Sequence, residues 1–499
     1  MTFAVVYSRA LVGVAAPLVR VEVYLASGLP QFSLVGLPDT EVRESRERVR
    51  AALANCGFRF PQRRITVNLA PADLPKQSSR FDLPIAIGIL AASDQLPTSD
   101  LGTHEFVGEL ALSGELRSVR GALPMAMAAG GQQHRFVLPA ASAPEGTLAG
   151  GAHIIPAVHL KDVCHHLSGG HRLEPLPAVT PVMPEYPDMA EVYGQRQARR
   201  ALEIAAAGGH HVLMLGPPGS GKSMLATRFP GICPAMSDEE ALISAAILSA
   251  DGENLCLEHW RRRPFRHPHH SATLVAMTGG GLHSRPGEIT LAHGGTLHLD
   301  EMAEFDRPVL EALREPMETG VISISRASRK TTYPARFQLI AAMNPCPCGY
   351  RGHPSGRCHC SPQQVQRYLR RISGPLLDRI DLVVEVPALD SRELHPGVAA
   401  ESSARMRRRV EVAAARQQRR QGQPNARLEG SALEEALGLD AESRRFLGEA
   451  AQRFALSARA IHRVMRVART VADLDGTGRV ALPALAEALN YRERLKDFW

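Results

Sequence analysis

Eight consecutive residues near the middle of the chain have the composition and spacing of a phosphate-binding loop. They follow the pattern G-x-x-x-x-G-K-[ST] and are Gly216, Pro217, Pro218, Gly219, Ser220, Gly221, Lys222 and Ser223. Glycines let successive backbone N–H groups turn toward phosphate oxygens. In this pattern Lys222 reaches the β- and γ-phosphates of ATP, and Ser223 ligates Mg²⁺. The alternative, a chance glycine-rich turn, is disfavoured because a strand pattern precedes the loop and a helix pattern follows it.

Two acids and an amide downstream have the types and positions needed to complete an ATP-hydrolysing site. The apolar run 297–299 leads directly into Asp300 and Glu301. We expect Asp300 to hold Mg²⁺ through water and Glu301 to polarise the attacking water. A second strand-like run, 336–343, ends at Asn344, which we expect to orient that water near the γ-phosphate. Ordinary strand ends with solvated polar residues are the alternative in both cases.

A cluster of thiols follows the second of these runs. The cysteines are Cys346, Cys348, Cys358 and Cys360. Four thiolates are a set that tetrahedral Zn²⁺ accepts, and we expect a small structural knuckle beside the nucleotide site. The C-x-C spacing is tighter than the usual two-residue gap, so unligated or disulfide-forming thiols remain an alternative. His353 and His359 are substitute ligands.

Strand-like segments alternate with helical ones around the phosphate-binding loop. The strand-like segments are 210–215, 296–300, 336–343 and 381–387, and a helix is expected over 222–229. This alternation predicts an α/β fold with a parallel, doubly wound sheet. We predict an N-terminal α+β domain over 1–168, a Pro- and Gly-rich linker over 169–188, an ATPase core over 189–390 and an α-helical lid over 391–499.

Composition limits the function classes without choosing among them. The formal charge of +7 over 499 residues permits a nucleic-acid partner but does not require one. No apolar run reaches the roughly 18 residues of a membrane helix, and the N-terminal segment makes a poor signal peptide. We therefore expect a cytoplasmic protein with no membrane partner. In a reducing compartment, clustered cysteines indicate metal binding before disulfides.

The order of these motifs resembles that of AAA+ ATPases of the Mg-chelatase-like branch. The segments RPFRHPHH (263–270), PGEITLAHGGTLHLDE (286–301) and NPCPCGY (344–350) are similar to the ComM/YifB family, and the resemblance covers essentially the whole chain. It implies an ATP- and Mg²⁺-dependent homo-oligomer, a hexameric ring. Such a ring binds single-stranded and branched DNA, drives branch migration in natural transformation and recombination, and works with recombination proteins.

Two arginines acquire roles through this resemblance. Arg379, in the segment LLDRID, would be an arginine finger that reaches the γ-phosphate bound by the neighbouring subunit. The alternative is a salt bridge with Asp378 or Asp381. Arg459 matches the lid sensor arginine of this branch.

The helix that carries Arg459 presents two further arginines on the same face. Arg463 and Arg466 follow it at helical spacing. Only one of the three needs to touch nucleotide. We expect Arg463 and Arg466 to be solvated or to face a neighbouring subunit.

An insertion between the acids and Asn344 is predicted to form a hairpin. Segments 321–325 and 331–338 alternate like strands, and the basic residues at the turn are Arg326, Arg329 and Lys330. In related motors such a hairpin projects into the ring pore, where these side chains would grip DNA phosphates. An ordinary solvated turn is the alternative. Loop 263–281 is expected to be a second pore element rather than a metal site, because its histidines have no thiol or carboxylate nearby in sequence.

The N-terminal segment 61–131 resembles the Lon-protease-like domain. Lon-type proteolysis needs a Ser nucleophile activated by a Lys amine. By the motifs, Arg80 falls where that Ser would be and Leu123 where the Lys would be. Nearby in sequence are Ser78 and Ser79, with Lys76 as the candidate base. We expect a non-proteolytic domain that binds DNA or assists ring assembly.

Two other functions share parts of this pattern. A magnesium chelatase motor subunit, which drives Mg²⁺ insertion into a tetrapyrrole, has the same AAA+ module. As far as the family pattern goes, it lacks the Lon-like domain and the C-x-C pairs found here. An ATP-dependent Lon-like protease is disfavoured by the absent Ser–Lys dyad.

Overall fold

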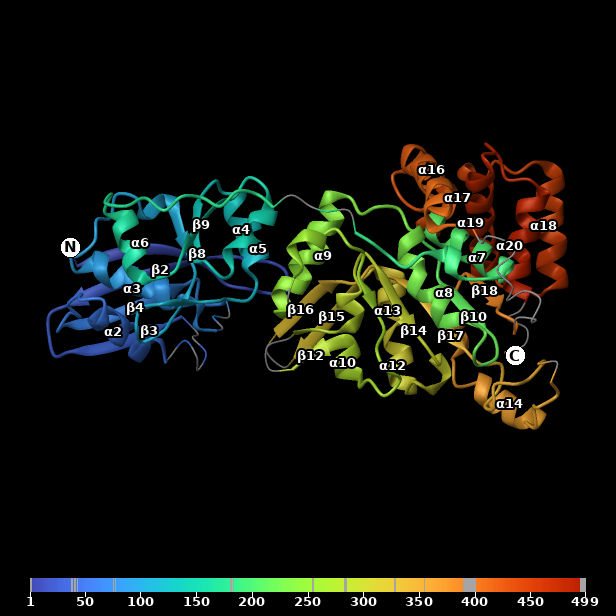
Figure 1. Cartoon of the computed structure of the whole chain (residues 1–499), viewed down its shortest axis with the longest axis horizontal. Helices are drawn as coiled ribbons and strands as arrows, with labels where there is room; N and C mark the ends of the chain where they lie inside the picture. The colour runs from blue at the N-terminus through green and yellow to red at the C-terminus, as the bar shows by residue number, and fades with distance from the viewer. Residues whose placement is uncertain are drawn as a thin grey trace.

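The three parts of the chain lie in a row along the long axis of the molecule (Figure 1). A mixed sheet with its helices occupies the N-terminal end, a parallel sheet with its helices lies in the middle, and a group of helices forms the C-terminal end. The computed structural model describes residues 2–493 except positions 37, 38, 40, 41, 43, 75, 77, 180, 181, 183, 254, 282–284, 327, 328, 354 and 389–400.

The N-terminal domain is a mixed sheet in the order β3-β4-β2-β1-β5-β8-β9. Its strands are β1 (Phe3–Arg9), β2 (Leu18–Ala26), β3 (Gln31–Val35), β4 (Arg64–Ala70), β5 (His104–Phe106), β8 (Arg135–Pro139) and β9 (His153–Ala157). A small hairpin, β6 (Glu109–Leu110) and β7 (Leu116–Arg117), stands apart. The helices are α2 (Ser45–Asn55), α3 (Asp82–Ala92), α4 (Ala122–Gly130), α5 (Ala143–Gly146) and α6 (Leu160–Leu167). Every residue of α3 is buried, so its apolar run belongs to the core of this domain.

The middle of the chain is built on a five-stranded parallel sheet in the order β11-β14-β17-β10-β18. Its strands are β11 (Phe265–Arg266), β14 (Thr296–Leu299), β17 (Gln338–Met343), β10 (Val212–Leu215) and β18 (Leu382–Glu385). Both faces of the central strands are buried, which is why they read as continuous apolar runs. The predicted α/β fold with a parallel sheet is confirmed.

Helices flank this sheet on both sides. They are α7 (Arg196–Gly208), α8 (Lys222–Arg228), α9 (Asp238–Asp251), α10 (Leu274–Thr278), α11 (Glu288–Leu291), α12 (Arg307–Ala312), α13 (Arg314–Thr319), α14 (Pro362–Leu369) and α15 (Gly374–Leu377). Between α10 and α11 runs a short ladder, β12 (Gly279–Gly280) with β13 (Arg285–Pro286). Helix α7 is followed by Gly209, which has the left-handed backbone that favours glycine, and the chain then turns into β10.

Strand register brings the predicted polar residues to one edge of the sheet. Leu215 at the end of β10 pairs with Met343 at the end of β17. Leu299 at the end of β14 pairs with Ala341. In a parallel sheet the carboxyl ends of the strands meet at the same edge, which is where ligands bind in open α/β folds.

The predicted hairpin is present as β15 (Val321–Arg326) paired with β16 (Arg329–Pro334). The second strand ends four residues earlier than expected, at Pro334, because proline has no N–H to continue the ladder and the chain turns into β17. Arg326 and Arg329 face each other in the register. The side chains of 325–330, including the three basic residues of the expected DNA contact, lie outside the described residues.

The N-terminal domain docks onto the ATPase core through α4 and α9, which are neighbours in Figure 1. Leu123 and Leu148 share an apolar cluster with Met236 and Trp260. The Leu123 N–H donates to Ser249 Oγ over 3.2 Å. The position that matches the Lon lysine is therefore an apolar residue buried where the two parts meet.

The Ser and Lys side chains of the N-terminal domain make other contacts. The Lys76 ammonium donates to the Pro71 carbonyl. The Ser79 hydroxyl donates to Glu109, and Ser78 Oγ accepts from Arg80 Nε over 2.8 Å. Among the hydrogen bonds of the described residues, none joins a serine hydroxyl to a lysine amine.

The described residues of the C-terminal part form helices and the turns between them, as predicted. Its helices are α16 (Ser403–Gln421), α17 (Gly430–Leu437), α18 (Ala441–Arg453), α19 (Ala458–Asp475) and α20 (Leu482–Glu493). Helices α16 and α19 pack on α7 and share its apolar cluster. None of the helices that the structure describes is long and apolar enough to cross a membrane.

Candidate active site

The phosphate-binding loop connects β10 to α8. Gly219 and Gly221 have φ angles of +76° and +93°, which favour glycine. Gly216 has a second requirement, since a Cβ there would lie 2.1 Å from the Val386 carbonyl oxygen. Gly219 and Gly221 are thus required by their backbone conformation, and Gly216 is required by its close packing on the end of β18.

Lys222 is the charged centre of the loop. Its side chain is only 7% exposed, and Nζ donates to the carbonyls of Gly216 and Pro217 over 2.7 and 2.8 Å. Burial lowers the pKa of Lys222, and the charges of Asp300 and Glu301 act against that shift. These contacts hold the ammonium inside the curve of the loop, where phosphate oxygens would replace the carbonyls as acceptors.

The two acids after β14 lie beside the start of α8. The Ser223 hydroxyl donates to Asp300 Oδ2 over 2.6 Å. Burial raises the pKa of Asp300, but this hydrogen bond and nearby charges outweigh it and leave the pKa below its ordinary value. Ser223 and Asp300 are therefore positioned so that they could hold Mg²⁺ together, with the hydroxyl oxygen turned toward the ion in place of this hydrogen bond.

Glu301 has an unusual backbone. Its φ of +50° is left-handed, which is uncommon for a residue with a side chain, and strain of this kind concentrates at functional sites. The turn leaves its carboxylate 55% exposed next to Asp300, whose Oδ1 accepts from the Glu301 N–H over 2.9 Å.

Asn344 reaches the same place from the neighbouring strand. The Gly216 N–H donates to the Met343 carbonyl over 3.2 Å, which fixes the strand tip against the loop. Asn344 Oδ1 then lies 3.4 Å from Lys222 Nζ. The structure brings Asp300, Glu301 and Asn344 together around the loop, while their catalytic roles stay predictions.

Gln195 is a contributor to this site that the sequence reasoning missed. It is nearly buried and takes a left-handed backbone just before α7. Its Nε2 donates to the Ser220 carbonyl over 3.1 Å and to the Pro387 carbonyl over 2.7 Å. It thereby ties the phosphate-binding loop to the end of β18. A lone polar residue before a helix carries no signal that would have singled it out.

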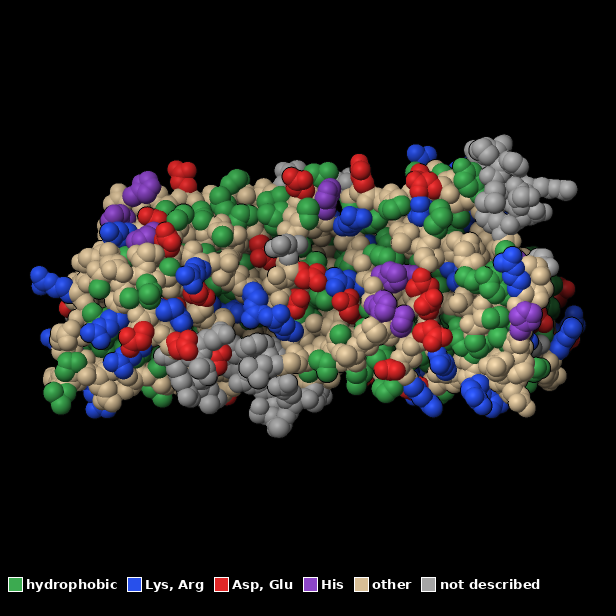
Figure 2. Space-filling model, turned by 60° about the horizontal axis from the view of Figure 1, so that its bottom comes forward, with side chains coloured by type: hydrophobic (Ala, Val, Ile, Leu, Met, Phe, Trp, Pro, Cys, Tyr) green, Lys and Arg blue, Asp and Glu red, His purple; other side chains and the backbone are tan. Residues whose placement is uncertain are grey.

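Histidines gather next to acidic side chains on one face of the ATPase core (Figure 2). His270 Nδ1 lies 3.7 Å from Glu301 Oε2, and His298 Nε2 lies 4.0 Å from Asp300 Oδ2. The ring of His267 is 4.7 Å from that of His298. Burial lowers the pKa of His298 to about 4. No carboxylate lies near the loop histidines along the chain, but the fold brings Asp300 and Glu301 close to the histidines in space.

The four cysteines form one cluster. Their sulfur atoms all lie within 4.8 Å of one another, and Cys346 Sγ is 3.4 Å from Cys348 Sγ and 3.8 Å from Cys358 Sγ. A tetrahedral zinc with bonds of about 2.3 Å separates its sulfurs by about 3.8 Å. Disulfide bonds would need sulfurs about 2.05 Å apart. The cluster can therefore hold a tetrahedral metal with little movement.

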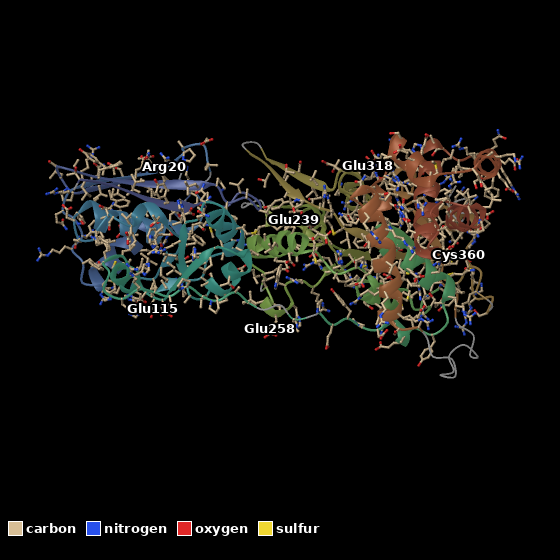
Figure 3. All side chains as sticks on the ribbon, turned by 90° about the horizontal axis from the view of Figure 1, so that it is seen from above. Arg20, Glu115, Glu239, Glu258, Glu318 and Cys360 are labelled. Atoms are coloured by element: carbon tan, nitrogen blue, oxygen red, sulfur yellow. The ribbon has the colours of Figure 1, made fainter. Side chains whose placement is uncertain are left out.

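The cysteine cluster packs on the nucleotide site. Gly349 is so close to the loop that a Cβ there would lie 2.7 Å from Pro218 Cδ. Cys360 lies toward the lid end of the molecule, away from Arg20 in the N-terminal sheet (Figure 3). Of the substitute ligands, His353 Nδ1 is engaged with Ser355 Oγ at 2.7 Å, and His359 is exposed.

Arg379 is buried at the end of α15. Its Nη2 pairs with Glu318 Oε1 over 2.5 Å, and its Nη1 donates to the Pro375 carbonyl over 2.6 Å. Figure 3 shows Glu318 on the side of the core that meets the lid helices. The alternative of a salt bridge with Asp378 or Asp381 is wrong, because Glu318 takes that place.

The arginines of α19 separate into two kinds. Arg463 donates to Asp381 Oδ1 over 2.7 Å, and Arg466 donates to the Leu428 carbonyl over 2.7 Å. Both are partly buried and hydrogen-bonded within the chain, so the expectation that they are solvated is wrong, whereas contact with a neighbouring subunit stays a prediction. Arg459 is exposed, and its charge helps to lower the pKa of Glu318, after the hydrogen bond from Arg379. The charge of Arg459 thus acts on the same carboxylate that Arg379 pairs with.

Three family models cover most of the chain. The model described as "Magnesium chelatase, subunit ChlI" matches residues 188–394. "Subunit ChlI of Mg-chelatase" matches residues 21–142, and "Magnesium chelatase, subunit ChlI C-terminal" matches residues 400–492.

Several proteins are similar over almost their whole length. Competence protein ComM of Haemophilus influenzae is 48% identical over 99% of this chain and 98% of its own. Uncharacterized protein YifB of Escherichia coli is 48% identical over 99% of this chain and 97% of its own. Uncharacterized protein Rv2897c of Mycobacterium tuberculosis is 40% identical over 98% of each chain.

Replacing Glu301 with Gln should leave ATP binding intact and lower hydrolysis by about 10²–10⁴-fold, because the amide cannot accept a proton from water. Phosphate release and binding of a fluorescent ATP analogue measure the two effects. The matched control is Glu304→Gln, since Glu304 is exposed nearby and pairs with Arg371 over 2.6 Å. Equal turnover in the Glu301 variant and the wild type would refute the role of Glu301.

Proposed function

The chain belongs to the ComM/YifB family of magnesium-chelatase-like AAA+ ATPases, and on that premise we propose that it is an ATP-driven DNA motor that works as a hexameric ring. The observation that carries the proposal is the separation of the catalytic groups into two clusters. Asp300, Glu301 and Asn344 gather at Lys222, whereas Arg379 pairs with Glu318, whose carboxylate also responds to the charge of Arg459.

Each cluster supplies half of a hydrolytic site. The first half can bind MgATP and position water, and Lys222 is the cation that it brings to the phosphates. Arginine fingers contribute about 10³–10⁵ in rate in phosphoryl transfer. In the ring, Arg379 and Arg459 of one chain act on the nucleotide held by the next. Displacement of Glu318 from Arg379 accompanies this step, since the γ-phosphate is the stronger partner for the guanidinium.

DNA is the substrate on which this motor acts. The hairpin β15–β16 carries Arg326, Arg329 and Lys330 around its tip, and such side chains bind phosphates without reading sequence. The whole-length similarity to a protein named for competence supports a role in natural transformation. The motor we propose acts there on single-stranded and branched DNA, in the cytoplasm and together with recombination proteins. Branch migration is the activity that this combination supports best.

Chelatase activity is the second candidate, because the matching family models carry the chelatase name. DNA dependence of ATP hydrolysis separates the two functions, since a chelatase motor has no need of DNA. A proteolytic function has no Ser–Lys pair among the described residues to support it.

The proposal includes a zinc ion, bound by the four cysteines, with a structural role. Its knuckle follows Asn344 directly and packs on Pro218, so it would brace two parts of the nucleotide site at once. The ion would take no part in ATP chemistry, since four protein ligands leave no open position.

Metal analysis of the purified chain should find one zinc per chain. Replacing Cys348 and Cys360 together with Ser should remove it, because only two of the four thiolates remain. The control is Cys256→Ser, an exposed thiol outside the cluster, which should keep the zinc. Full zinc content in the double variant, or none in the wild type, would contradict the assignment.

Single-stranded or branched DNA should stimulate ATP hydrolysis by the wild-type chain. The double variant Arg329→Ala, Lys330→Ala should bind DNA more weakly than the wild type. The plot of log affinity against log salt should become shallower by about 0.7–0.9 for each phosphate that the variant no longer neutralises. Arg444→Ala with Arg445→Ala, an exposed pair on α18, is the control of equal charge. If no DNA stimulates ATP hydrolysis by the wild-type chain, the proposed motor function is wrong.

Arg379→Ala alone should bind ATP but hydrolyse it about 10³-fold more slowly. Mixing Arg379→Ala chains with Glu301→Gln chains should restore part of the activity. Some interfaces then combine an intact Glu301 from one chain with an intact Arg379 from the next. A mixture that forms rings but stays as inactive as its components would show that Arg379 does not act between chains.

A further inference from the structure

A second group of metal-ligating side chains lies behind the predicted Mg²⁺ position. His267, His298 and Asp300 each offer one atom, and these atoms all lie within 4.8 Å of one another. His298 lies in β14, and Asp300 is the first residue after that strand. His267 follows β11, the neighbouring strand, whose Arg266 pairs with Leu297.

The buried imidazole of His298 points to what this group binds. Its Nδ1 lies 2.7 Å from the Ile340 carbonyl oxygen, which can only accept, so Nδ1 carries the hydrogen. Its Nε2 is then a lone-pair acceptor. The side chain is fully buried, and this atom has no hydrogen-bond partner among the described residues. A buried unpaired nitrogen is costly, and most such atoms have a partner.

Nε2 of His298 faces another acceptor. Asp300 Oδ2, which accepts from the Ser223 hydroxyl, is 4.0 Å away, and either a cation or a water between the two atoms would give His298 Nε2 a partner. Metal–nitrogen and metal–carboxylate bonds of about 2.1 Å each span about 4.2 Å when in line. The 4.0 Å gap lies within that span, so a metal ion can bond both atoms after small side-chain shifts.

We propose that His267, His298 and Asp300 form a binding site for a divalent first-row transition-metal ion. Two imidazoles and one carboxylate select nickel, cobalt or zinc over magnesium. The ion shares Asp300 with the Mg²⁺ of bound ATP, so its binding inhibits hydrolysis. This second step rests on the proposed function, whereas metal binding itself does not.

The neighbouring histidines provide an internal comparison. His269 is exposed on the same loop, but its Nδ1 is engaged with Ser271 Oγ at 2.8 Å. His270 leans toward Glu301 rather than Asp300. His267 is exposed, so its removal leaves the buried core intact, unlike removal of His298. His267→Ala and His269→Ala are thus matched variants that differ in one ligand.

Calorimetric titration with Ni²⁺ tests the site. The sample is the tag-free full chain without nucleotide, with its cysteines already loaded with zinc. The wild type and His269→Ala should bind one ion alike. His267→Ala should bind it at least about tenfold more weakly, because removing even a supporting residue of a metal site costs that much. No Ni²⁺ binding by the wild type, as expected if water bridges His298 and Asp300, overturns the proposal. So does equal binding by His267→Ala and the wild type.

Inhibition gives the second measurement. The ratio of MgATP hydrolysis with and without Ni²⁺ should fall in the wild type and in His269→Ala and stay near one in His267→Ala. An equal fall in all three would contradict inhibition through this site. If no chain hydrolyses ATP but Ni²⁺ binding still depends on His267, the metal site is supported and the proposed motor function fails.

Discussion

Parallel pairing of β10 between β17 and β18 is the constraint on which the rest of the nucleotide site depends. The ladder aligns Leu215 with Met343, and the first amide of the phosphate-binding loop continues it onto the Met343 carbonyl. A shift by one residue would turn the strand tips to the opposite face of the sheet. The contacts of Lys222 with Asn344 and of Ser223 with Asp300 exist because this register is fixed.

Around this edge the chain places its charges in separate groups. The buried Lys222 faces carboxylates and carbonyls near the loop, whereas the buried Arg379 is balanced by Glu318 at the lid side. A buried charge is tolerated only with a partner, so each group is self-consistent in a single chain. That separation is why the proposed mechanism needs a neighbouring chain. In the single chain, the Glu318 carboxylate pairs with the Arg379 guanidinium in place of a phosphate.

Much of the nucleotide site could be predicted because its signals are contiguous. The glycine pattern, the acids after β14, the Asn after β17 and the cysteine pairs each lie within a few residues, and local backbone rules connect them to loops and strand ends. The strand segments of the parallel sheet are predicted as well, from their apolar runs. The predicted end of β16 is wrong, because the alternation of apolar and polar residues continues past Pro334, whereas the pairing of β16 with β15 ends there.

The sequence by itself determined which chemical groups the chain carries and which strands and loops bear them, because those depend on neighbours along the chain. Only the tertiary structure decided which distant groups meet. It set Gln195 against Ser220, Glu318 against Arg379, and His298 behind Asp300. It also enclosed Arg463 and Arg466, whose helical spacing alone suggested exposure. Strand order and helix packing fix these contacts, and neither leaves a pattern within a short stretch of residues.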